Sequence, residues 1–115
     1  MGVLSVARAL GDRELKTPGR AVICAIPEFR SLTIESMDEF LVLACDGLFD
    51  VMTGQEVVDF VALHKSSTPP GGVWDTGLCA QMLVNHALDD LYSQDNVSVI
   101  IVELVQKSNP LLKAC

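Results

Sequence analysis

The sequence predicts an α+β fold, with mainly antiparallel strands and two helices packed on one face of the sheet. Short apolar runs of strand length occur in three places: within the first third of the chain, at residues 40–45, and at residues 97–102. Two segments with apolar residues at helical spacing lie between the last two runs, from about 53 to 63 and from 76 to 91. The predicted element order is therefore strands, two helices and a final strand.

The first third of the chain contains three candidate strands. Residues 2–7 and 21–25 are short apolar runs, separated by a polar segment in which Pro18 and Gly19 mark a loop. Between 29 and 34 apolar and polar residues alternate, which is typical of a half-exposed strand. We therefore expect strands at all three places.

The run from Phe40 to Cys45 is uninterrupted by polar residues, and a tight turn at 37–39 leads into it. A short run of this kind indicates a strand buried on both faces, and the run at 97–102 has the same character. Two strands buried on both faces need more covering layers than two helices provide. We therefore expect the chain to be part of a larger fold.

The first helix begins with Thr53 and Glu56 at the spacing of a capping box, in which each side chain binds the backbone N–H of the other residue. Residues 65–73 are a loop by composition. The second helix has one apolar face, and 93–96 breaks it. That face is formed by Cys79, Leu83, Ala87 and Leu91, widened by Val84 and Leu88. We assign 1–104 to one part of a domain and 105–115 to a frayed tail.

Composition excludes several classes of function. The net charge of −7 argues against binding a nucleic-acid backbone or an anionic membrane. No apolar run approaches the ~20 residues that span a bilayer, and no secretory signal is evident. The four cysteines are far apart and form no zinc-type pair, so Cys45 and Cys79 are expected to be reduced core residues. A cytoplasmic or nuclear location follows as an expectation.

Three acids stand at the ends of the buried strands. Asp46 ends the run at 40–45, Asp50 follows one helical turn later, and Asp95 precedes the run at 97–102. If these strands are antiparallel neighbours, the three carboxylates converge at one end of the sheet, and Gly47 lets another group approach the backbone closely. Two unit charges ~5 Å apart at an effective dielectric of ~20 repel by about 3 kcal/mol, so such a cluster favours a bound cation.

Oxygen ligands select hard ions such as Mg²⁺ or Mn²⁺. The alternative is structural, because Asp-Gly and Asp-Asn are common turn dipeptides and Asp50 is suited to capping a turn. Residue types and spacing alone leave both interpretations open.

Four short blocks in order resemble the metal-dependent serine/threonine protein phosphatases of the type-2C family, over roughly residues 2–104. The blocks are LSVARALGD at 4–12, AIPE at 25–28, DEFLVLACDGLFDV at 38–51 and SQDNVSV at 93–99. The resemblance implies a partial α-β-β-α phosphatase sandwich and a phosphoprotein substrate. It also implies two divalent ions, Mg²⁺ or Mn²⁺, and a metal-activated water that attacks phosphorus without a phospho-enzyme.

The resemblance assigns metal-ligand roles to three residues. It implies that Asp46 and Asp95 are ligands of the metal pair and that Asp50 belongs to a further, weaker metal position. Arg8, in the first block, is expected to pair with an acid, while Gly11 permits a turn. Two departures, Ala7 for Ser and Tyr92 for Gly, do not touch these ligands.

The larger departure is a missing half. The family carries its other metal acids and a phosphate-binding arginine in an N-terminal portion of well over a hundred residues, which nothing in this sequence matches. We therefore expect a C-terminal portion that is inactive alone, completed by the missing N-terminal half of the domain. A non-catalytic, phosphatase-like binding or regulatory module is the alternative. A haloacid-dehalogenase mechanism at Asp46 is excluded, because it needs an acid where Ala44 stands.

Overall fold

The computed structural model describes residues 6–16, 19 and 22–105. The chain divides into two compact units, Met1–Thr33 and Ile34–Cys115, which are described separately. The predicted strand at 2–7 and the predicted frayed tail fall wholly or largely outside the described residues.

The first unit holds little regular structure among its described residues. A short 3₁₀ helix, η1, spans Arg13–Lys16, and Arg8 and Cys24 form an isolated parallel bridge. The Nη2 atom of Arg8 lies 2.6 Å from Oε1 of Glu28, and Gly11 has a left-handed φ of 81°. The expected structural roles of Arg8 and Gly11 are thus confirmed.

Two of the predicted strands in the first third are wrong. Residues 29–34 form no strand, and the predicted strand at 21–25 is reduced to the single bridge at Cys24. A strand is defined by the neighbour it pairs with, and none of the described strand pairings includes 29–34. The apolar side chains of Phe29, Leu32 and Ile34 are accordingly exposed.

The second unit is built on a two-stranded antiparallel sheet. Strand β1 spans Phe40–Ala44 and β2 spans Val99–Glu103. Their register pairs Ala44 with Val99 and Phe40 with Glu103, so the end of β1 meets the beginning of β2. Both strands were predicted within two residues.

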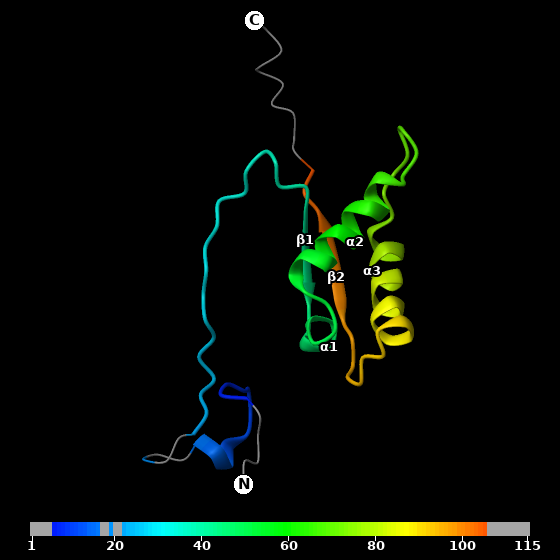
Figure 1. The fold of residues 1–115 in the computed structure, drawn as a ribbon. Coiled ribbons are helices and arrows are strands. Elements are labelled where there is room, and N and C mark those ends of the chain that lie inside the picture. The colour runs from blue at the N-terminus through cyan, green and yellow to red at the C-terminus, as the bar shows by residue number, and fades with distance from the viewer. Residues whose placement is uncertain (1–5, 17–18, 20–21, 106–115) are drawn as a thin grey trace, which may run out of the picture. The chain divides into compact units, whose positions relative to one another are not determined.

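Helices complete the second unit (Figure 1). A single turn, α1, spans Asp46–Phe49 and directly follows β1. Helix α2 spans Gly54–Ser66, and Thr53 and Glu56 form the predicted capping box at its start. Helix α3 spans Thr76–Asn85 and continues as a π-helical turn, η2, over His86–Asp90. The α+β class with both longer helices on one face of the sheet is therefore confirmed.

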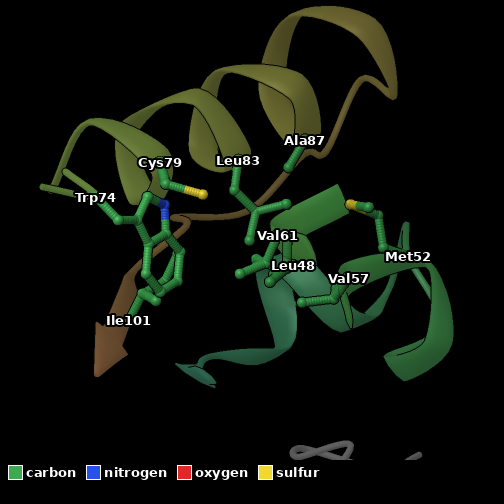
Figure 2. Packing of buried hydrophobic residues seen from close by; sticks show 9 residues of the cluster. All are labelled: Leu48, Met52, Val57, Val61, Trp74, Cys79, Leu83, Ala87 and Ile101. Carbon is green, nitrogen blue, oxygen red and sulfur yellow. The ribbon is translucent and has the colours of Figure 1, made fainter. Parts of the chain in front are cut away.

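The core lies between the helices and the inward face of the sheet (Figure 2). Every second residue of each strand points into it, including Val42 of β1 and Ile101 of β2. The buried cluster comprises Leu48, Met52, Val57, Val61, Trp74, Cys79, Leu83, Ala87 and Ile101.

The other face of the sheet is uncovered in the described part of the chain. The cross-strand pair Leu43 and Ile100 is 48% and 61% exposed, and the pair Leu41 and Val102 is exposed beside it. The prediction that both strands are buried on two faces is wrong for these residues. An apolar run without alternation indicates that both faces of a strand are suited to burial. A face is buried only where another layer of the protein packs on it.

Trp74 anchors the connection between α2 and α3. Its ring meets Phe40 edge to face, with ring centroids 5.9 Å apart, and the Nζ atom of Lys65 lies 5.3 Å from its centroid. Lys65 also lies 3.1 Å from Glu39 and 3.7 Å from Glu103. This contact holds the end of α2 against one end of the sheet, opposite the three predicted acids.

Candidate metal centre

Asp46 lies where the sheet ends and α1 begins. The preceding strand fixes its backbone, because the Cys45 N–H donates to the Ser98 carbonyl across the sheet at 3.2 Å. The Asp46 side chain is exposed, and its Oδ1 accepts the Gly47 N–H at 3.1 Å. An acid at the first position of a helical turn is favoured by the exposed N–H groups there.

Asp95 lies in the loop that leads into β2, at the same end of the sheet. Its side chain is exposed, and Oδ1 accepts the N–H of Asn96 at 2.7 Å. Among the described residues, the side chains of Asp46 and Asp95 each accept a hydrogen bond only from the backbone N–H of the following residue. Their Oδ2 atoms meet no hydrogen-bond donor in the described part of the chain.

Asp50 follows α1 as its C-terminal cap, and its N–H donates to the Asp46 carbonyl at 2.8 Å. This confirms the one-turn relation between the two residues. Asp50 and Asp95 line one open pocket together with Val51, Tyr92, Ser93 and Gln94. Asp46 does not line that pocket.

The described residues do not bring three metal-ligating side chains together. No group of three or more His, Cys, Asp or Glu side chains among them is placed to hold a metal ion. The donor chemistry nevertheless fits a hard divalent ion, because all three groups are exposed carboxylates without a cationic partner among the described residues. The ligand roles of Asp46, Asp50 and Asp95 stay predictions.

Close contact between two segments defines this end of the sheet. A Cβ atom added to Gly47 would lie 2.3 Å from the Asn96 carbonyl oxygen, so no side chain fits there. The Ser93 hydroxyl donates to the Gly47 carbonyl at 2.7 Å. The turn after β1 and the loop before β2 therefore touch through backbone atoms, as the glycine predicted.

Sequence reasoning missed the part that two side chains play here. Cys45 was predicted only as a reduced core residue, yet its Sγ atom makes hydrogen bonds with the Asn96 carbonyl and the Ser98 N–H. Ser93 was noted only in a helix-breaking segment. The available signal was that each stands one or two residues before a predicted metal ligand.

The two histidines take part in packing rather than in the acid group. His64 and His86 both contact the Phe60 ring, with centroids 4.7 and 5.3 Å away. The Nδ1 atom of His86 lies 2.7 Å from Oδ2 of Asp90. Both contacts lie on the helical layer, away from the strand ends.

The described cysteines are free thiols in different environments. Cys79 is buried in the core, and this burial raises the pKa of its thiol above the ordinary value of 9.0. Cys45 is half-buried and Cys24 is exposed. The expectation of a core residue is confirmed for Cys79 and is wrong for Cys45, while the reduced state of both stays a prediction.

The second unit is thus an α+β layer of helices over an antiparallel sheet, with Asp46 directly after β1 and Asp95 in the loop before β2. The described part of the chain contains no helix long and apolar enough to cross a bilayer. The family model for protein phosphatase 2C matches residues 1–97. The chain belongs to the protein phosphatase 2C family, as its four sequence blocks suggested.

Individual relatives agree with this assignment. The chain is 41% identical over 110 residues to the probable protein phosphatase 2C 47 of Oryza sativa subsp. japonica, covering 92% of this chain and 26% of that protein. It is 33% identical over 115 residues to the probable protein phosphatase CG10417 of Drosophila melanogaster, covering 96% of this chain and 17% of that protein.

Human protein phosphatase 1G is 43% identical over 76 residues, which cover 62% of this chain and 14% of that protein. The chain thus spans about a quarter or less of these three relatives, and it corresponds to their C-terminal part.

Proposed function

We propose that this chain forms one wall of the metal centre of a protein serine/threonine phosphatase. In this proposal Asp46 and Asp95 are ligands of a Mg²⁺ or Mn²⁺ pair, and Asp50 serves a weaker position nearby. The activity belongs to a complete domain that contains this chain together with the missing N-terminal half. The observation that carries the proposal is the meeting of the Asp46 turn and the Asp95 loop at one strand end, in a member of this family.

The chain's own residues contribute position and charge. Strand β1 fixes the backbone position of Asp46 at the end of the sheet. Hydrogen bonds from Cys45 to the Asn96 and Ser98 carbonyls hold the Asp95 loop beside that strand end. The outward Oδ2 atoms are available to a cation, and a phosphoprotein side chain would approach from the same exposed side. Bound divalent ions would supply a water of lowered pKa and positive charge beside the phosphoryl oxygens.

A cytoplasmic or nuclear location is part of the same proposal. The three described cysteines are free, as expected for a reducing compartment.

The second candidate is a non-catalytic binding module of the same family. One observation favours it: the described residues hold no complete group of three metal ligands. The two candidates differ in what happens when the missing half is supplied, because only a phosphatase gains activity.

Hydrolysis of p-nitrophenyl phosphate with Mn²⁺ tests the proposal. We expect no turnover from the 115-residue chain and measurable turnover from a longer form that carries the family's N-terminal half. In that longer form Asp46→Asn removes a ligand from charge stabilisation worth several kcal/mol, so turnover should fall by about a hundredfold or more.

The matched control is Asp89→Asn, which removes one exposed carboxylate from η2, away from the strand ends. It should leave turnover unchanged. An inactive longer form that also binds no Mn²⁺ would sink the enzyme proposal and support the binding module.

A further inference from the structure

The thiol of Cys45 occupies both of its hydrogen-bonding roles across the strand end. Its Sγ donates to the Asn96 carbonyl oxygen at 3.1 Å and accepts the Ser98 N–H at 3.2 Å. The Cys45 N–H also donates to the Ser98 carbonyl at 3.2 Å. One residue thus makes three bonds to the segment just after Asp95.

Ser93 makes the complementary contact on the other side of the same acids. Its hydroxyl donates to the Gly47 carbonyl at 2.7 Å, and this bond is partly buried. Cys45 and Gly47 flank Asp46 in the chain, while Ser93 and Asn96 flank Asp95. The two contacts therefore bracket both acids.

Two other contacts attach the bracketed loop to the second unit: the Ser93 N–H donates to the Ala87 carbonyl at 2.8 Å, and Val97 packs against the core. Residues 92–98 belong to no helix or strand, and Asp95 and Asn96 are exposed. A side chain on Gly47 would push the Asn96 carbonyl away, so glycine permits the approach but supplies no attraction. The direct hydrogen bonds between this loop and the residues flanking Asp46 come from the hydroxyl of Ser93 and from the thiol and N–H of Cys45.

We propose that Cys45 and Ser93 are positioning residues that set the placement of the Asp95 carboxylate relative to the Asp46 carboxylate. Metal ligands must lie within about 0.2 Å of their proper distances, so a loop free to shift binds metal poorly. The consequence for metal binding rests on the proposed function, whereas the positioning itself is a property of this chain.

Hydrogen exchange of the 115-residue chain, and Mn²⁺ binding by the longer form that carries the family's N-terminal half, test this proposal. Cys45→Ala and Ser93→Ala each remove side-chain bonds, so exchange of the 93–98 backbone amides should quicken by about twofold to tenfold. Mn²⁺ affinity should fall with it. Cys45→Ser can still donate and accept, so it should restore most of both readouts.

Ser98→Ala is the matched control, because Ser98 is exposed and uses only its backbone N–H and carbonyl at the junction. It should resemble the parent chain. Unchanged exchange in both Cys45→Ala and Ser93→Ala would overturn the proposal, as would an equal effect of Ser98→Ala.

The two readouts separate the proposals. Quickened exchange in the 115-residue chain, together with a longer form that never binds Mn²⁺, supports positioning and counts against the metal role of the acids. Mn²⁺ binding with unchanged exchange supports the metal site and overturns positioning. If Cys45→Ala does not fold, Ser93→Ala and Cys45→Ser still decide the matter.

Discussion

Tyr92 carries a backbone conformation that its side chain opposes. Its φ of 56° is left-handed, and it stands where the family commonly has glycine. The side chain is 73% exposed, so it gains little from packing. A non-glycine residue in this region costs about 1–2 kcal/mol, which the neighbouring hydrogen bonds of the loop must offset. The departure at Tyr92, which does not touch the predicted ligands, therefore strains the local backbone.

Replacing Tyr92 with glycine or alanine tests this backbone strain. Tyr92→Gly should relieve it, and because glycine also gains entropy in the unfolded chain, the net increase in the free energy of unfolding should be modest, below about 1 kcal/mol. Tyr92→Ala keeps a Cβ atom and should give no gain. Urea unfolding of the three proteins measures the difference. Equal gains from glycine and alanine would show that the side chain, rather than the backbone, was unfavourable.

Gly47 is constrained by its surroundings and not by its backbone dihedral angles, because the Asn96 backbone leaves no space for a side chain. We predict that Gly47→Ala lowers the free energy of unfolding by about 1–3 kcal/mol, because the new Cβ atom would meet backbone atoms that cannot rotate away. The Asn96 oxygen would be 2.3 Å and the Asn96 carbon 3.0 Å from it.

Gly54→Ala provides the comparison for that substitution. Gly54 begins α2 and has no atom within 4 Å of an added Cβ. Alanine is the better helix former, so this change should be neutral or stabilising by up to about 1 kcal/mol. Thermal unfolding that ranks the two variants the other way would contradict the close approach at Gly47.

At the scale of elements, the start of α2 was predictable in detail because a capping box uses only local residues. The Glu56 carboxylate accepts the Thr53 N–H at 2.7 Å, and the Thr53 hydroxyl accepts the Glu56 N–H at 3.3 Å. The bond from the Thr53 N–H is the main cause that holds the pKa of Glu56 below its ordinary value of 4.5. A second hydrogen bond, donated by the Thr53 hydroxyl to the Glu56 carboxylate, lowers that pKa further. The helix start is therefore linked to pH.

The direction of the Glu56 pKa shift determines how the free energy of unfolding depends on pH. Because the folded-state pKa of Glu56 is the lower one, its contribution to stability is present above pH 4.5 and is lost as the pH falls through the folded pKa. Glu56→Gln should flatten this part of the stability profile below pH 4.5. Thermal unfolding across this range measures it, and an unchanged acid profile in Glu56→Gln would contradict the role.

Thr53 also accepts the Glu56 N–H through its hydroxyl, a bond of the same cap that does not depend on the ionisation of Glu56. Thr53→Ala should cost about 1 kcal/mol, because the N–H of Glu56 loses its acceptor. Thr53→Ser keeps a hydroxyl and should cost much less.

At the scale of the whole molecule, predictability followed the range of the interactions. The helices, the capping box and the strands at 40–45 and 97–102 depend on nearby residues or on one strong apolar pair, and all were predicted. The strands at 21–25 and 29–34 depend on partners that the described residues do not supply, so their pattern alone misled. The three acids stay predicted ligands, and the sequence pattern could not show that Asp46 lies outside the pocket that Asp50 and Asp95 share.

The bare outer face of the sheet has a consequence for the whole chain. Leu43 pairs with Ile100 and Leu41 with Val102, and these four exposed aliphatic side chains form one contiguous patch on two strands. Exposed apolar patches and unpaired strand edges favour association between copies. The chain alone should therefore self-associate, with an average mass in sedimentation that rises over the micromolar range.

Substitution of one cross-strand pair tests this expectation. Leu43→Thr with Ile100→Thr places β-branched residues suited to a strand at both positions but removes apolar surface, so association should weaken by about tenfold or more. Val58→Thr, which changes a single exposed aliphatic side chain on α2, should leave the sedimentation profile as it was. If the pair variant associates as strongly as the parent chain, the contact between copies lies elsewhere, and the strand edges become the surface to test because they offer unpaired backbone groups regardless of side chain.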